Sequence, residues 1–498
     1  MIPYPSWLNS GDNTWQLVAA TLVGLMSIPG IAILYGGLVQ RKWIVNTMLM
    51  AFTAFSVVLV AWVLYEFQMS FGTPMHLGPG ILHSAVGRPG TILGAKSETG
   101  QANIPLVSGQ GLMPAFRFPQ SSLAYFQFAF AAITPLLFLG SVIGRMNFRA
   151  WLLFVLLWSG IVYSVNAFLL WGGGWWAQMG ALDYSGGYVI HLAAGTSGFV
   201  AAAVIGPRLA RDRAKAVPNN LPMVACGAGF LWLGWNGFNG GDEYFGGQNA
   251  SAAVLNTNLT TAVALLTWVL LDMFLSKQRK PTFLGAVNGM IVGLVAITPA
   301  AGFVTGTGAI LIGVIASAVV WCSWNYFAKV SFMRKVDDAL GVFHTHGVAG
   351  LLGGLLVGLF ADPAMAVYYN KDGSVVSVAG LFHGHPKQLA LQAGAAATII
   401  VWDGLMTFLI LKFLGLFMKL RLPDDVLELG DVEIHDEEAY PSEDGLVAVG
   451  AAPSAPSSSS STASSPASSS SASSTASSSP ASSSATEPDR AAEPAAEP

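Results

Sequence analysis

Two histidines occupy matching positions in two apolar stretches of the chain. The first stretch carries, in order, Asp183, Gly186, His191, Gly195 and Gly198. The second repeats these five residue types 155 positions later, with His346 at the place of His191. An ionisable residue inside an apolar span indicates a functional site by default. Two such residues related by a repeat are harder to explain by packing than a single one.

Imidazole chemistry restricts what such a pair can do. In a dry channel the charged form is costly, so both rings should be neutral, each with one donor and one acceptor nitrogen. Two rings that share a proton suit a small neutral molecule or a proton relay. They do not suit a hydrated cation, because the sequence offers no ring of carboxylates or carbonyls to replace its water.

A metal site is the alternative, because His344 and His346 form a His-x-His pair. Residues two apart on a helix point about 200° apart, so they cannot bind one ion unless the helix breaks. Cys226 and Cys322 form no Cys-x-x-Cys site. We therefore expect no metal and no cofactor, and we leave His344 open between a pore-facing and a packing role.

Other polar and aromatic residues have more than one interpretation. Trp171 precedes three glycines and is either an interfacial belt residue or a cation–π platform. Asp183 begins its span and most simply caps a helix, as Asp338 does in the second repeat. Asp403 lies in the middle of an apolar run and must face protein.

The composition identifies the elements that must position these residues. Of 498 residues, 53 % are hydrophobic and only 10 % are charged, and the mean hydropathy is +0.56. A soluble domain carries about 25 % charged residues. These values exclude a soluble enzyme, a nucleic-acid binder and a disordered protein. They predict a polytopic membrane protein.

Apolar runs predict eleven transmembrane helices. They lie near 14–39, 45–67, 121–143, 150–171, 187–206, 219–239, 256–275, 282–300, 307–326, 341–361 and 388–415. Sixteen of the 23 Lys and Arg residues follow spans 1, 3, 5, 7, 9 and 11. By the positive-inside rule, the N-terminus is outside and the C-terminus is cytoplasmic.

The histidine motifs lie in spans 5 and 10, and a shared tetrapeptide lies in spans 3 and 8, at 132–135 and 296–299. Matching spans are five apart, so the two halves cross the membrane in opposite senses. This pattern predicts an all-α fold with a five-plus-five inverted repeat and an eleventh helix, and its site should lie between the repeats. The repeat should bring His191 and His346 face to face.

Three regions follow. Residues 1–415 form the transmembrane domain, and 416–450 form an ordered cytoplasmic segment. Residues 451–498 are rich in Ser, Ala and Pro, and we expect them to be disordered.

The chain resembles the ammonium transporters (Amt, Mep and Rhesus proteins), most closely the Mep and plant type 2 branch. The resemblance runs from about 14 to 440. It rests on LWGGG (170–174), DYSGGYVIH (183–191), GWNGFNGG (234–241), ITP (297–299) and DDALGVFHTHG (337–347).

The resemblance implies selective ammonium transport by a homotrimer with one pore per protomer in the plasma membrane. NH4+ would bind outside and lose its proton, and NH3 would pass the pore, with or without a separately conducted proton. Methylammonium would be an analogue substrate. No enzyme activity and no nucleic acid is expected.

Functional residues carry over by motif. The pore is assigned to His191, His346 and Trp235, the gate to Phe130 and Phe238, and the outer ammonium site to Trp171, Phe130 and Asp242. Asp183 would be the supporting acid. The segments 430–431 and 438–440 resemble those that couple neighbouring protomers, and this region is a candidate contact for cytoplasmic regulators.

Asp242 departs from the family pattern, because bacterial members have Ser four positions after the gate Phe. Its carboxylate either attracts the cation or points away. Two other functions stay open: a neutral gas channel of Rhesus type, against which Trp171 argues, and an ammonium sensor.

Overall fold

The computed structural model describes residue 1 and residues 3–441. The prediction of a disordered tail over 451–498 lies outside the described residues, and so do residues 442–450 of the predicted cytoplasmic segment.

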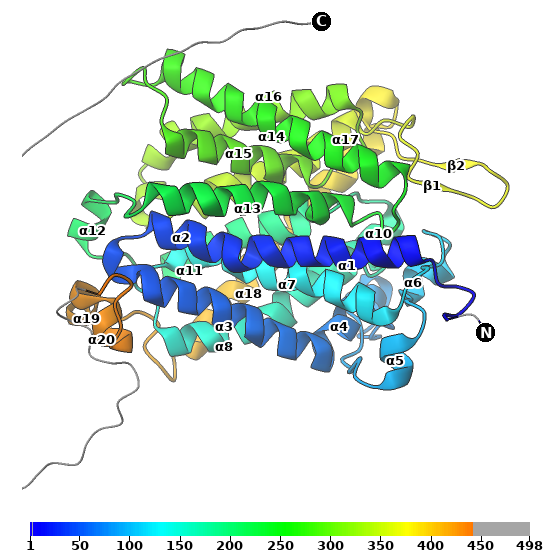
Figure 1. Ribbon diagram of the computed structural model, residues 1–498, viewed down its shortest axis with the longest axis horizontal. Helices are drawn as coiled ribbons and strands as arrows, with labels where there is room; N and C mark the ends of the chain where they lie inside the picture. Colours follow the sequence, from blue (N-terminus) through cyan, green and yellow to red (C-terminus); the bar gives the residue numbers. More distant parts are fainter. Residues whose placement is uncertain (2, 442–498) are drawn as a thin grey trace, which may run out of the picture. The chain divides into compact units, whose positions relative to one another are not determined.

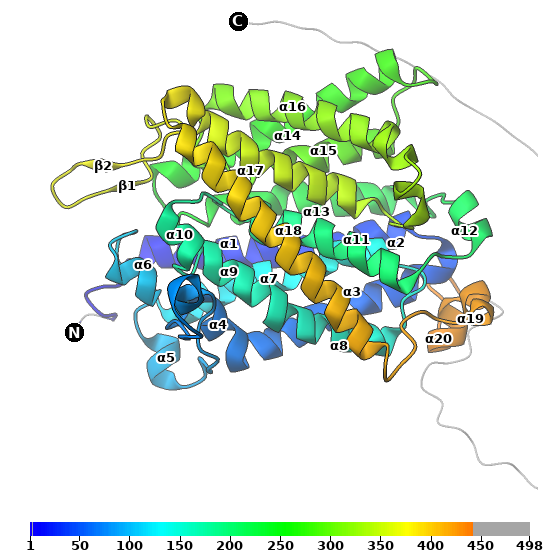
Figure 2. The same ribbon diagram turned by 180° about the vertical axis from the view of Figure 1, so that it is seen from behind.

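The helices that form the body of the protein lie side by side along one common direction (Figures 1 and 2). They are α1 (Ser10–Leu25), α2 (Ala32–Leu38), α3 (Ile44–Ala61), α7 (Gln120–Val142), α8 (Phe148–Trp158), α9 (Ser164–Leu170), α11 (Ala193–Ile205), α13 (Leu221–Gly240), α14 (Gln248–Leu275), α15 (Phe283–Ile297), α16 (Gly306–Asn325), α17 (Ala349–Phe360) and α18 (Pro386–Leu414). Helix α7 is buried along most of its length, and α1, α3 and α11 pack against it.

Shorter elements lie at the two ends of the bundle. They are α4 (Phe67–Phe71), α5 (Ala95–Thr99), α6 (Pro105–Gly109), α10 (Trp175–Met179), α12 (Ala210–Ala214), α19 (Asp424–Leu429), α20 (Asp431–His435), β1 (Tyr368–Tyr369) and β2 (Val375–Val376). The two strands form an antiparallel hairpin with Tyr368 opposite Val376.

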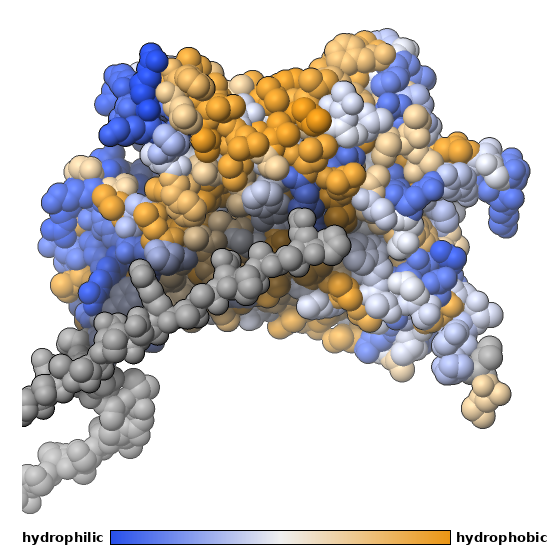
Figure 3. All heavy atoms as spheres, turned by 45° about the horizontal axis from the view of Figure 1, so that its top comes forward, coloured by the Kyte–Doolittle hydropathy of each residue, from blue (hydrophilic) through white to orange (hydrophobic). Residues whose placement is uncertain are grey.

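The two ends differ in content. The N-terminus, α5, α6 and the hairpin lie at one end, which we call the N-terminal end (Figure 1). Helices α12, α19 and α20 lie at the other, which we call the basic end because most Lys and Arg residues lie there. An apolar band separates these two more hydrophilic ends (Figure 3). Such a band is what lipid requires of a spanning protein.

Within the described residues, nine helical segments are long and apolar enough to cross a membrane. The two other predicted spans are also helical. Helix α15 is apolar but has only 15 residues, and α13 has 20 but carries Asn and Gly. The count of eleven spans therefore stays a prediction, and so does the inverted repeat. The all-helical membrane fold is confirmed.

Two π-helical turns carry the paired histidines. They are η6 (Gly187–Leu192) and η9 (Phe343–Val348), and each leads directly into a long helix, α11 or α17. A left-handed glycine precedes each turn, Gly186 with φ +108° and Gly341 with φ +74°. Glycine adopts this conformation without steric cost. A π turn holds one extra residue and re-aims its side chains, and such turns are frequent at functional sites.

Candidate functional site

The two histidines of the repeat lie side by side. Nδ1 of His191 is 3.2 Å from Nδ1 of His346, and the ring centroids are 5.3 Å apart. Both rings are buried, and Nε2 of His191 has no hydrogen-bond partner among the described residues. A hydrogen bond between the two Nδ1 atoms requires one ring to donate and the other to accept. The neutral pair then presents one Nε2 lone pair and one Nε2–H.

Glycines of the repeated motif allow this approach. A Cβ on Gly195 would lie 2.2 Å from the Cα of Gly347, and one on Gly350 would lie 2.9 Å from the Cβ of His191. Side chains at these positions would push the two helices apart. The motif glycines therefore act through close backbone contact.

The two aspartates of the motif cap the π turns. Asp183 Oδ2 accepts hydrogen bonds from the backbone N–H groups of Tyr188 and Val189, both at 3.0 Å. Asp338 accepts in the same way from Val342 (3.2 Å) and Phe343 (2.9 Å). This geometry is the capping role that the sequence suggested. Asp183 Oδ1 is buried without a partner among the described residues.

A column of aromatic rings leads away from His191. The ring of His191 stacks on those of Trp235 and Phe238, with centroid distances of 5.3 and 5.8 Å. The ring centroids of Phe238 and Phe130 are 4.6 Å apart, and those of Phe130 and Trp171 are 6.1 Å apart. Because α9 ends at Leu170, beside α10 at the N-terminal end, the column runs from the histidine pair toward that end.

Polar contacts fix the ring positions at both ends of the column. Trp235 Nε1 donates to Thr298 Oγ1 at 2.9 Å, and Trp171 Nε1 donates to the Asp183 carbonyl at 2.7 Å. Thr298 belongs to the ITP segment that the sequence singled out. Trp171 is therefore tied to the loop that begins the histidine motif.

Asp242 is buried and held by two neighbours that the sequence analysis missed. Ser185 Oγ donates to its Oδ2, and Gln127 Nε2 lies 3.5 Å from its Oδ1. Gln127 also donates to the Tyr244 hydroxyl at 2.8 Å, and Tyr244 has a left-handed backbone with φ +65°. The sequence positions of both residues could have indicated their role. Gln127 precedes Phe130 by about one helical turn, and Ser185 lies inside the DYSGG segment.

Two cavities lie between the histidine pair and the basic end. The larger has a volume of about 660 Å³ and is lined in part by Trp43, Trp268 and Trp324. The smaller, about 40 Å³, is lined by His346, Tyr35 and Asn288 among others, and Asn288 also lines the larger one. Both lie on the side of the histidine pair away from the aromatic column.

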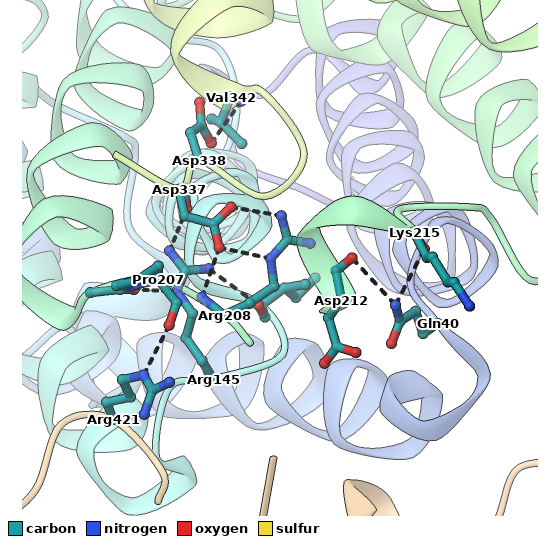
Figure 4. Close-up of polar contacts among 12 residues, drawn as sticks. Gln40, Arg145, Pro207, Arg208, Asp212, Lys215, Asp337, Asp338, Val342 and Arg421 are labelled. Carbon is teal, nitrogen blue, oxygen red and sulfur yellow. Dashed lines mark hydrogen bonds and ion pairs between the residues drawn. The ribbon is translucent and has the colours of Figure 1, made fainter. Parts of the chain in front are cut away.

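An ion-pair network supports the wall of the larger cavity (Figure 4). Arg208 donates to both carboxylate oxygens of Asp337, at 2.9 and 2.7 Å. Burial alone raises the pKa of Asp337, but the guanidinium of Arg208 outweighs it and holds that pKa below its ordinary value. The buried Arg145 donates to the backbone carbonyls of Gly206 and Asp337. This network joins the ends of α7 and α11 to the loop before η9.

The segment after α18 docks on the same end. Asp431 caps the N-terminus of α3 by accepting from the backbone of Val45 (2.8 Å) and Asn46 (2.9 Å). Burial raises its pKa to about 6, against the opposing effect of these backbone donors. Lys42 donates to the Leu427 carbonyl at 2.6 Å and pairs with Asp212 at 3.1 Å. The segment therefore touches loops of its own chain that line the larger cavity.

Two residues left open by the sequence lie outside the column. His344 Nδ1 is 2.8 Å from Ser323 Oγ, and its ring packs edge-on against Trp324. The Asp403 carboxylate accepts from Asn166 at 2.9 and 3.0 Å and faces protein, as its position required. Over residues 1 and 3–441, no group of three His, Cys, Asp or Glu side chains could hold a metal ion.

Comparison with known proteins gives one consistent result. The family described as Ammonium Transporter Family matches residues 14–440. Ammonium transporter 2 member 1 of Oryza sativa subsp. japonica is 47 % identical over 440 residues, 88 % of each chain. Ammonium transporter 2 of Arabidopsis thaliana is 46 % identical over 439 residues, 88 % of this chain and 89 % of that one.

Solved structures agree. The crystal structure of Saccharomyces cerevisiae Mep2 has a TM-score of 0.72 and 31 % identity, and the match covers 84 % of this chain and 89 % of that one. A protein titled Sensor Amt Protein shares the fold at 23 % identity, with a TM-score of 0.69 over 84 % of this chain and 96 % of that one. The chain belongs to the ammonium transporter family and is a transporter-type membrane protein, not an enzyme.

Proposed function

We propose that this chain carries ammonium selectively across a membrane along the aromatic column, past the histidine pair and into the two cavities. The observation that carries this proposal is the Nδ1–Nδ1 contact of 3.2 Å between His191 and His346, between the column and the cavities. A neutral, hydrogen-bonding constriction between aromatic walls suits NH3.

The outer site comprises Trp171, Phe130 and Asp242. A cation over an indole gains about 0.5–2 kcal/mol. The buried carboxyl group of Asp242 lies beside the column, where burial raises its pKa above the ordinary value, and a cation bound next to it favours the ionised form. Ammonium is attracted there with part of its water removed. The supporting acid Asp183 holds the loop to which Trp171 is bound.

Ammonium must lose its proton before it passes the gate formed by Phe130 and Phe238. These rings contact each other at 4.6 Å and leave an apolar environment in which a bare cation is costly. NH3 then exchanges hydrogen bonds with the Nε2 atoms of the two histidines and passes Trp235. The proton either returns outside or follows a separate route.

The N-terminal end faces outward in this proposal, and the basic end faces the cytoplasm of a cell whose plasma membrane holds the protein. Three copies associate, each with its own pore. The faces of α13 and α14 fit this contact, because Leu233 and Leu255 are exposed there. Beside them, Asn258 bonds Asn236 (2.6 Å) and Trp232 (2.9 Å) in a partly exposed polar set that suits protein better than lipid.

A neutral gas channel is the second candidate, but it would have no use for a cation site at Trp171 and Asp242. A sensing role is compatible with transport, because the docked segment of residues 416–440 touches loops that line the larger cavity. Neighbouring protomers or cytoplasmic regulators would act through that segment.

Current and isotope uptake should be measured together in proteoliposomes that contain the full chain. Saturable uptake of labelled ammonium, with methylammonium as a weaker competitor, supports the transporter. Uptake that follows only the NH3 concentration as pH varies would favour the gas channel. The ratio of the charge moved, measured as current, to the labelled ammonium taken up shows whether the proton is conducted.

A further inference from the structure

A short loop at the N-terminal end brings two exposed histidines together. It runs from Thr73 to Arg88, and backbone hydrogen bonds close it: Met75 N donates to Val86 O (2.8 Å) and Arg88 N donates to Thr73 O (2.8 Å). Gly87 N also donates to Met69 O (2.7 Å), which ties the loop to α4. The loop is thus fixed at its base, and its tip carries His76 and His83.

The two imidazoles lie against each other at the surface. Their centroids are 3.9 Å apart and their planes differ by 32°. Both residues are exposed, so no apolar core accounts for the contact. His76 Nδ1 lies 3.4 Å from the backbone carbonyl of His83.

That carbonyl contact selects the tautomer of His76. A carbonyl oxygen only accepts, so this contact favours the tautomer in which Nδ1 carries the proton and Nε2 keeps its lone pair. Metal-bound histidines almost always donate their other ring N–H to a carbonyl, a carboxylate or water in this way. His76 therefore has the arrangement of a metal ligand before any metal arrives.

We propose that His76 and His83 form a surface site for a divalent transition-metal ion of the Zn²⁺ and Cu²⁺ class, with water in the remaining positions. Two nitrogens bound at about 2.0–2.1 Å to one ion lie roughly 3 Å apart. In the structure the rings are stacked with centroids 3.9 Å apart and a 32° tilt, so both exposed side chains must rotate before their nitrogen lone pairs converge on one ion. Imidazole suits Zn²⁺ and Cu²⁺, whereas Mg²⁺ and Ca²⁺ prefer oxygen ligands.

The site is separate from the proposed ammonium path and does not depend on it. Within the described part of the chain, no third His, Cys, Asp or Glu joins the pair. Its affinity should therefore be below that of a closed structural zinc site.

Cu²⁺ bound to the full, untagged chain in detergent should be followed by electron paramagnetic resonance. We expect one equivalent of copper with nitrogen modulation from two imidazoles. His76→Gln or His83→Gln should leave one imidazole and weaken binding about tenfold or more, because even the loss of a ligand's outer-shell partner costs about 10–100-fold. His385→Gln, also exposed at the N-terminal end, is the matched control and should change neither quantity.

Competition between bound copper and other divalent ions tests which class of metal the site prefers. Zn²⁺ should displace the copper, and Mg²⁺ in large excess should not. The proposal is wrong if both loop variants keep the two-imidazole signal, or if the wild-type chain binds copper no better than the double variant. Ammonium uptake by the two loop variants should equal that of wild type, so this result is independent of the transport proposal.

Discussion

Replacing Asp242 with Asn tests how the outer site attracts its cation. Asn has nearly the same shape and still accepts a hydrogen bond, so the contacts with Ser185 and Gln127 can persist. The substitution removes the charge and turns one acceptor oxygen into an NH2 group, from which Ser185 Oγ can accept a hydrogen bond while it donates to the Phe238 carbonyl. A change in uptake can then be assigned to electrostatics.

The expected magnitude follows from the position of the carboxylate. Asp242 lies four residues after the gate residue Phe238, and Ser185, which binds its carboxylate, also bonds the Phe238 carbonyl. An ionised carboxylate about 6–8 Å from a cation contributes roughly 2–3 kcal/mol at an effective dielectric constant near 20. The cost of ionising a buried acid whose pKa is raised reduces this gain, so the figure is an upper bound. Each 1.4 kcal/mol is a factor of about ten. The ammonium concentration for half-maximal uptake should therefore rise, by at most about a hundredfold.

The assay is uptake of labelled ammonium against concentration in proteoliposomes. Asp372→Asn is the control, because Asp372 is an exposed acid of the hairpin loop at the same end. An unchanged half-saturation concentration in Asp242→Asn, with normal thermal stability, would show that the carboxylate does not act on the cation.

Three other perturbations test separate parts of the account. Trp171→Leu should raise the half-saturation concentration about two- to thirtyfold, which corresponds to the loss of a cation–π contact. An unchanged half-saturation concentration would show that Trp171 does not bind the cation. Deletion of residues 451–498 should leave uptake intact, whereas deletion from Leu427 should reduce it; equal loss in both would contradict this division. Asp337→Asn should destabilise the protein by about 1–3 kcal/mol, because the partly buried guanidinium of Arg208 loses a charged hydrogen-bond partner, seen as a lower Tm in detergent. An unchanged Tm would mean that the pair does not hold the basic end together.

Sequence periodicity predicted most of the helices because lipid demands long apolar segments. It predicted α15 as a full span, but the helix ends at Ile297, just before Thr298 and Pro299. It could not foresee the π turns, because their extra residue depends on packing between η6 and α17. The equal spacing of the two motifs predicted that His191 and His346 face each other, and their Nδ1 atoms lie 3.2 Å apart.

The surroundings of Asp242 were beyond sequence reasoning. Gln127 is 115 residues away in the chain, and only the packing of α7 beside the loop after α13 brings it near. The loop in turn depends on the left-handed backbone of Tyr244, which no local pattern indicates. Contacts between distant segments therefore set the chemistry of the outer site.

The histidine pair is the central claim, and uptake by His191→Ala and His346→Ala proteoliposomes tests it most directly. Both variants should keep the oligomeric state of the wild type, because in the proposed pore each ring lines the path of the ammonia and lies away from the contact between protomers. Both should lose saturable, methylammonium-sensitive uptake of labelled ammonium, while His385→Ala should keep it. Wild-type selective uptake by a well-folded His191→Ala or His346→Ala variant would contradict the account and return the pair to a structural role.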